Sequence, residues 1–205
     1  MAKPSYLPAE VTTYWDPDEG RVVQPPGAIL EYLTSPCNGR TLNGISGAYT
    51  WPNVTSTLAL TTTYQDVTGS VISYTPPTGT KTVLYRFVWQ IDVTANSGIC
   101  SYKFSLDGTE IIPAYRSIAP GEYVSNQHHN ANEILEWGIQ CDADTDDLAN
   151  GALAGWTTSK ELKLEAREHN ASYQQVLHAN TWRNGAGVAA PFDLAVPILT
   201  IIAIG

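Results

Sequence analysis

An acidic run is the first segment whose side chains could do chemistry. It reads Asp142-Ala143-Asp144-Thr145-Asp146-Asp147, and alternate carboxylates of this kind can converge on one calcium ion. The EF-hand loop, however, requires glycine at its sixth position and glutamate at its twelfth, where this sequence has Asp147 and Leu153. The run is therefore not an EF-hand. It favours a solvated acidic loop, and an irregular calcium site stays open as the alternative.

The histidines offer few metal ligands. His128 and His129 are adjacent, so on a strand they would point to opposite faces and could not easily share a metal ion. His169 and His178 are expected on neighbouring strands and could approach each other. No cysteine or carboxylate accompanies them at the spacing typical of zinc sites. We therefore expect no metal and no cofactor.

Nucleophilic and acid–base motifs are equally scarce. The sequence contains no Gly-x-Ser-x-Gly motif, no phosphate-binding loop and no cysteine–histidine dyad. A glycosidase needs two convergent carboxylates, and among 20 acidic residues pairs such as Glu133 and Glu136 always occur. Nothing selects one pair over another, so we expect no catalytic residue and no enzymatic activity.

Tryptophan side chains are the other candidate binding groups, because a loop tryptophan can stack on a sugar ring. The candidates are Trp51, Trp137, Trp156 and Trp182, although Trp137, like Trp89, lies on an apolar strand face and is expected in the core. Trp156 follows the acidic run in a glycine-rich loop and is the best exposed candidate. With His128 and His129 it makes up a candidate recognition loop. A loop tryptophan can instead anchor its own loop or a subunit interface, and this alternative stays open.

The composition bounds the partners. With 11 Lys and Arg against 20 Asp and Glu, the chain carries a formal charge of −9, which repels phosphate backbones and anionic lipid. We therefore expect neither nucleic acid nor a membrane as a partner. The 3 cysteines are an odd number, so at least one is unpaired, and the first residues lack the apolar stretch of a secretory signal. These features predict synthesis in a reducing compartment.

Residues 1–26 differ from the rest of the chain. They hold five prolines and four acidic residues without hydrophobic periodicity. Because each proline removes a backbone donor, we expect this stretch to join no sheet and no helix. Its apolar residues do not suit a solvated linker, so we expect an anchoring arm that lies across its own domain or docks on a neighbouring subunit. The expected anchors are Tyr6, Leu7, Val11, Tyr14 and Trp15.

Residues 27–205 carry the pattern of strands and turns. The clearest strand runs over 83–93, where apolar residues alternate with others. The last strand is continuously apolar, which predicts a central position with both faces buried. About ten strands without a convincing helix predict an all-β domain, a jelly-roll β-sandwich preceded by the extended arm. Besides 83–93, strands are expected at 28–33, 50–60, 64–74, 102–106, 109–115, 135–141, 162–167, 172–179 and 198–204, with a hairpin turn at 107–108.

Several short segments carry a family resemblance. They open the domain, form its longest strand and its hairpin, and close it, at residues 26–30, 64–70, 72–77, 81–89, 104–109 and 199–205. Together they resemble small virion structural proteins of tailed bacteriophages, commonest in marine phages and cyanophages. Such proteins are similar in plan to the trimeric jelly rolls of the C1q and tumour-necrosis-factor type. The resemblance covers about residues 26–205 and leaves the arm out.

The resemblance implies a capsid decoration (cement) protein or a head-fibre protein, made in the host cytoplasm and located in the virion. It also implies a homotrimer, whose partner would be the major capsid protein or a fibre-base protein. We expect the arm to hold the domain to the particle. The alternative function is a receptor-binding or glycan-binding tip of a tail fibre, which would recognise a host-surface glycan through the loops around His128 and Trp156.

Overall fold

The fold is described from a computed structural model. The described residues are 14–16, 21–23, 25–93, 98–119, 128–171, 175–183, 186–187 and 192–205. Within them, the regular elements are strands and two single-turn 3₁₀ helices, η2 (Ile112–Ala114) and η3 (Leu148–Asn150). In this part of the chain, no helix has the length and apolar character needed to cross a membrane.

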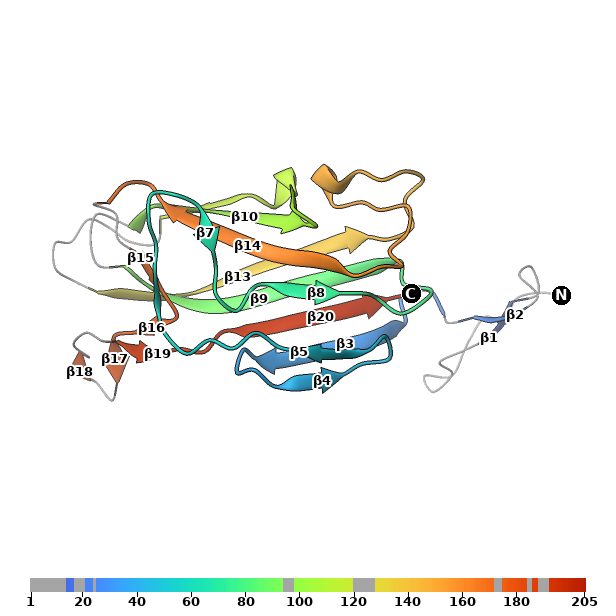
Figure 1. The fold of residues 1–205 in the computed structure, drawn as a ribbon, viewed down its shortest axis with the longest axis horizontal. Coiled ribbons are helices and arrows are strands. Elements are labelled where there is room, and N and C mark those ends of the chain that lie inside the picture. The colour runs from blue at the N-terminus through green and yellow to red at the C-terminus, as the bar shows by residue number, and fades with distance from the viewer. Residues whose placement is uncertain are drawn as a thin grey trace.

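Two six-stranded antiparallel sheets form the domain (Figure 1). Sheet I contains β3 (Ile29–Pro36), β6 (Leu58–Ala59), β9 (Thr82–Val93), β13 (His129–Gln140), β15 (Gln175–Leu177) and β20 (Ile198–Ile204). Sheet II contains β7 (Gln65–Asp66), β8 (Ile72–Tyr74), β10 (Cys100–Leu106), β11 (Thr109–Glu110), β12 (Arg116–Ile118) and β14 (Lys160–Glu168). Smaller two-stranded sheets pair β1 (Tyr14–Asp16) with β2 (Arg21–Val23), β4 (Thr41–Asn43) with β5 (Ala48–Thr50), β16 (Ala179–Asn180) with β19 (Asp193–Leu194), and β17 (Trp182–Arg183) with β18 (Ala186–Gly187).

The chain alternates between the two sheets, as in a jelly roll. It passes from β3 to β7 and β8, returns to β9, and then visits β10 and β12, β13, β14 and finally β15 and β20. The long strands of sheet I lie in the order β3-β20-β9-β13, and sheet II runs β8-β14-β10-β12. The first and last strands of the domain are therefore neighbours. This arrangement confirms the predicted all-β jelly-roll sandwich.

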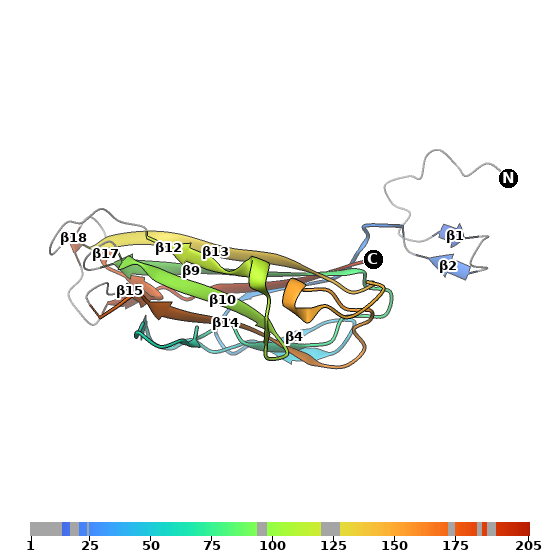
Figure 2. The same cartoon turned by 90° about the horizontal axis from the view of Figure 1, so that it is seen from above.

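The core is built around β9, the strand that the sequence predicts most clearly. Its alternate side chains point between the sheets, and β10 and β14 form the opposite wall. The ring centroids of Tyr85 and Phe104 lie 4.6 Å apart, and those of Trp89 and Tyr102 lie 5.2 Å apart. Burying one such side chain contributes roughly 1.5–3 kcal/mol. The long strands run along the length of an elongated sandwich (Figures 1 and 2).

Two predicted strands are largely irregular. Apart from Thr50, the last residue of β5, the segments 50–60 and 64–74 contain as named strands only β6, β7 and β8, each of two or three residues. Their backbone bonds in turns instead, as where Val54 N–H donates to Cys37 O at 2.8 Å. Pro52 lacks a donor and Gly69 has a φ of +90°, so neither continues a ladder. The Thr- and Val-rich composition of these segments therefore predicted more strand than forms.

The hairpin turn at Asp107 and Gly108 is confirmed. Their φ values are +53° and +79°, and a type I′ turn requires both to be positive. The strand predicted over 109–115, however, ends at Glu110. Pro113 lies in the first turn of η2, where the missing N–H of a proline costs no hydrogen bond.

Of the two predictions for the C-terminal strand β20, a central position and burial of both faces, the first is confirmed. β20 lies between β3 and β9, so its central position in the sheet is confirmed. The prediction that both faces are buried is wrong, because Leu199 and Ile201 are buried against sheet II whereas Ile198 is 42% exposed on the outward face.

The arm contains a hairpin that the sequence did not predict. β1 and β2 pair antiparallel, with Trp15 opposite Val22, so the expectation that residues 1–26 join no ladder is wrong. Neither β1 nor β2 contains a proline, so every residue of the two strands has an N–H group available for pairing.

The close packing of Gly69 gives a prediction about stability. A Cβ at this residue would lie 2.7 Å from Val54 Cγ2 and 3.0 Å from Pro197 Cγ, whereas at Gly79, with a φ of +92°, it would meet nothing within 4 Å. Gly69→Ala should therefore lower the free energy of unfolding by about 3 kcal/mol, from backbone strain plus overpacking. Gly79→Ala carries the strain alone and should cost about 1 kcal/mol. Urea denaturation of both variants measures the difference, and equal losses would contradict this account.

Candidate functional site

The arm joins the domain beside the C-terminus. Gly27 N–H donates to Gly205 O at 2.6 Å, and Gly205 N–H donates to Ala28 O at 2.8 Å. The β1–β2 hairpin belongs to neither sheet of the sandwich and lies beyond the end at which the chain terminates (Figures 1 and 2). We refer to this end of the sandwich as the arm end, and to the opposite end as the tip.

The five predicted anchors divide between described and undescribed residues. Tyr14 and Trp15 lie in β1, so the hairpin backbone fixes their spacing. Tyr6, Leu7 and Val11 lie outside the described residues.

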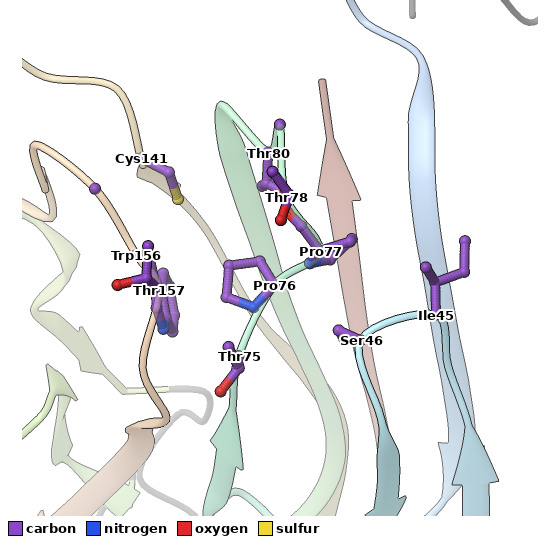
Figure 3. A pocket seen from close by; sticks show the side chains of 12 residues that line it. Ile45, Ser46, Thr75, Pro76, Pro77, Thr78, Thr80, Cys141, Trp156 and Thr157 are labelled. Atoms are coloured by element: carbon purple, nitrogen blue, oxygen red, sulfur yellow. The ribbon is translucent and has the colours of Figure 1, made fainter.

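A pocket of about 640 Å³ opens at the arm end (Figure 3). The β8–β9 loop supplies one wall, and the turn between β4 and β5 and the segment after the acidic run supply the others. Thr80 of the wall precedes Lys81, whose N–H donates to Ile204 O at 2.7 Å, so the pocket and the arm root are close together. None of the lining side chains is charged. The lining consists of Ile45, Ser46, Thr75, Pro76, Pro77, Thr78, Gly79, Thr80, Cys141, Gly155, Trp156 and Thr157.

A buried carboxylate fixes one wall of this pocket. Glu31 is 5% exposed and accepts hydrogen bonds from Ser46 N–H at 2.9 Å, Ser46 Oγ at 2.8 Å and Tyr74 OH at 2.8 Å. Burial and the hydrogen bond to Glu31 raise the pKa of Tyr74 well above its usual value, so the phenol stays a donor. These three hydrogen bonds offset the free-energy cost of burying the carboxylate. An unpaired buried charge costs on the order of several kcal/mol. No sequence motif marked Glu31, because it sits at an inward position of an ordinary strand.

Trp156 is not an exposed recognition residue. It is 5% exposed, its Nε1–H donates to Tyr74 O at 3.2 Å, and its ring meets the Tyr74 ring edge-on at 6.0 Å. The expectation of an exposed tryptophan is therefore wrong, and the alternative that it anchors its own loop is confirmed. The indole holds the loop after the acidic run against the sandwich.

The carboxylates of the acidic run point to separate partners. Asp142 pairs with Lys81 at 3.2 Å, and this hydrogen bond lowers the pKa of Asp142. Asp146 accepts from Ala154 N–H at 2.8 Å, and Asp147 accepts from Asn150 Nδ2 at 2.7 Å. Among the described residues, no three His, Cys, Asp or Glu side chains are grouped so that they could hold a metal ion.

At the tip, His128 contacts a fully buried carboxylate. Its Nδ1 lies 2.8 Å from Asp92 Oδ2, and Thr181 Oγ1 donates to Asp92 Oδ1 at 3.3 Å. The His128 ring also packs edge-on against Phe192, with centroids 5.3 Å apart. The sequence missed Asp92, since it looked like any polar residue on the outward side of β9.

The candidate recognition loop is therefore not one site. His128 and His129 lie at the tip, where β13 begins, whereas Trp156 lies at the arm end. β9 runs from one of these locations to the other, and its twelve residues span roughly 36 Å at the usual rise per residue. The structure brings His128 into contact with Asp92 and separates both histidines from the tryptophan.

His178 is a second buried titratable group near the tip. It follows β15, has a φ of +60°, and its Nε2 lies 2.9 Å from Thr68 O, while Nδ1 is buried without a hydrogen-bond partner. Because a carbonyl oxygen only accepts, Nε2 carries a proton and donates it to Thr68 O, so in the neutral ring Nδ1 is the unprotonated nitrogen. Burial lowers the pKa of His178 to about 4, from an ordinary value of 6.5.

The lowered pKa of His178 gives a pH-dependent stability. Between pH 6.5 and pH 4 the unfolded chain binds a proton that the folded chain does not, so this residue makes the protein less stable as the pH falls. From pH 7.5 to pH 4.5 the loss should be about 2.5 kcal/mol. His178→Asn, which tolerates the positive φ, should lack this loss, and the exposed control His169→Asn should keep it. Denaturation curves at the two pH values test this, and parallel pH profiles of His178→Asn and the native chain would contradict it.

Comparisons with known proteins leave the family open. No family model matches the chain, and no curated protein matches it. A chain in the structure of infectious bursal disease virus strain Gx is 12% identical, with a TM-score of 0.35 over 97% of this chain and 42% of that one. A chain from strain Gt is 13% identical, with a TM-score of 0.24 over 88% and 58%. This chain thus spans about half the length of each. Both TM-scores are below 0.5, so neither similarity identifies a function.

Proposed function

We propose that the chain is a structural protein of a virion, of the tailed-phage type, which the arm attaches to the particle and whose jelly roll decorates it as a capsid decoration or head-fibre protein. Its partner is the major capsid protein or a fibre-base protein, and it acts as a homotrimer without enzymatic activity. The family resemblance of residues 26–205 suggests this class.

The separation of the β1–β2 hairpin from the sandwich is the observation that carries the proposal. The hairpin pairs only with itself among the described strands. Among the residues whose burial is described, every member of the core lies between Leu33 and Leu177 or in β20, so these residues form a core within the sandwich. A short hairpin alone is at best marginally stable, and it gains stability when a partner covers it. An extension of this kind suits attachment to another protein better than support of its own domain.

Attachment through an arm is physically economical in an oligomer. Each arm needs only a small interface, because several arms on one assembly bind with an effective concentration that multiplies their individual affinities. Aromatic side chains commonly dominate such small contacts, and the hairpin carries Tyr14 and Trp15. Decoration then adds buried area between neighbouring capsid subunits and strengthens the shell.

The cysteines support a structural rather than a catalytic role. All three are free and buried, and burial raises the pKa of Cys37, Cys100 and Cys141 to about 12. They are therefore protonated and poorly nucleophilic near neutral pH. The glycan-binding alternative relied on an exposed Trp156, but this side chain is buried and anchors its own loop. We therefore propose attachment to the particle as the function.

The proposal predicts that the arm aromatics are needed for binding to the particle. The double variant Tyr14→Ala/Trp15→Ala should bind particles that lack the protein at least about tenfold more weakly, because anchor residues typically contribute 2 kcal/mol or more. The matched control Thr12→Ala/Thr13→Ala changes neighbouring arm residues that are not aromatic and should bind like the native chain. Co-sedimentation of each protein with the particles gives the binding curves.

A truncated chain of residues 27–205 provides the second comparison. It retains all the core residues that the structure describes, so it should stay folded and soluble yet fail to sediment with the particles. Saturable binding of the truncated chain would contradict attachment through the arm. Failure of every protein to bind, the native chain included, would contradict it as well.

A further inference from the structure

The outward faces of the two sheets differ sharply in chemistry. The outward face of sheet II carries ion pairs, with Lys103 Nζ 3.3 Å from Glu165 Oε2 and Lys163 Nζ 3.1 Å from Asp66 Oδ1. Lys103 also lies over the ring of Tyr64, 4.6 Å from its centroid. This is the ordinary surface of a half-buried sheet, whose polar side faces water.

Sheet I instead presents apolar rows on its outward face. In one row Tyr32 lies beside Ile202, which lies beside Leu84. Four residues along, Ile198 lies beside Val88, which lies beside Ile134. Tyr32, Ile134 and Ile198 are 57%, 54% and 42% exposed. Large apolar side chains aligned in register are not expected on a face that meets only water.

The row between them is polar but neutral. Thr34 Oγ1 and Thr200 Oγ1 lie 2.7 Å apart, and Arg86 Nε lies 3.6 Å from Glu136 Oε2. Arg86 and Glu136 are the only charged residues in these three rows of the described strands. The chain as a whole carries a charge of −9, yet these three rows have no net charge. Copies of the chain, which repel each other elsewhere, can therefore meet here.

The free edge of sheet I also favours a contact with another copy of the chain. Within the described residues β9 is the only strand paired with β13, and the other edge of β13 is bridged at Gln140 alone, through Gly151 O and Leu153 N–H, so most of that edge has no strand partner. A long edge strand beside an apolar face invites pairing or aggregation unless another chain covers it.

We propose that the outward face of sheet I is the contact between copies of this chain. Four strands of about seven residues span roughly 19 by 24 Å, or roughly 450 Å² in projection. A stable complex buries roughly 800 Å² per partner, and the flanking exposed side chains Ile29 and Val196 extend the patch toward that area. In a closed ring this face meets the neighbouring copies, which bring the same neutral pattern of apolar, polar and apolar rows, and Arg86 of one copy is able to pair with Glu136 of the next.

This inference takes only the number of copies from the proposed homotrimer. What it adds is the surface through which the copies contact each other. The isolated full-length protein, without particles, is sufficient for its test. Sedimentation equilibrium should give the native chain a mass of several times 22.2 kDa, and three times that mass agrees with the homotrimer. Ile134→Glu should raise the dissociation constant at least about 100-fold, because it places an unpaired charge in the contact.

The control is the same substitution at an isoleucine outside the face. Ile112 in η2 is 65% exposed, and Ile112→Glu should leave the assembled mass unchanged. Tyr32→Glu, on the opposite edge of the same face, should weaken assembly as Ile134→Glu does, and circular dichroism checks that each variant stays folded.

The outcomes separate this inference from the proposed function. A native mass of 22.2 kDa, or an assembly that neither Ile134→Glu nor Tyr32→Glu weakens, would overturn it. A dimer dissociated by these variants would support the interface and contradict the homotrimer. If the native chain assembles through this face but does not bind particles, only the proposed decoration of the particle is contradicted, and the interface between copies stands.

Discussion

The packing of aromatic side chains between β9 and β10 is the contact on which the rest of the structure depends. Because side chains alternate along a strand, burying Tyr85 and Trp89 between the sheets forces Arg86 and Val88 to face outward. β9 also carries β13 on one edge and β20 on the other, so its position sets the register of sheet I. The core and the outward face are thus two sides of one constraint, and neither can change without the other.

Polar networks close the two ends of this apolar core. At the arm end Glu31 ties the β4–β5 turn to Tyr74, and at the tip Asp92 ties His128 to Thr181. A buried carboxylate is costly unless donors surround it, so each network holds its loops in one arrangement. The long strands give the sandwich its length, and the carboxylates determine how the chain turns at its ends.

Periodicity predicted the long strands, but not the contacts that loops make. β9 and the turn at Asp107 were readable, because alternation and positive φ are local properties. The burial of Trp156 depends on Tyr74, 82 residues away in the sequence, and no local pattern reports such a partner. β13 begins at His129 rather than at residue 135, because backbone pairing with β9 extends it through residues that lack alternation. The apolar outward face needed the register of four strands, so it was visible only once the sheet was assembled.

The hydrogen bonds that join Gly27 to Gly205 have a consequence for engineering. The arm and the last residue leave the sandwich at one end, so a polypeptide fused after Gly205 would emerge beside the tether. A displayed epitope would sit better at the tip, which the length of β9 carries roughly 36 Å away. The root of the arm and the last residue thus lie together at one end of the sandwich, and the other end is available for a displayed epitope.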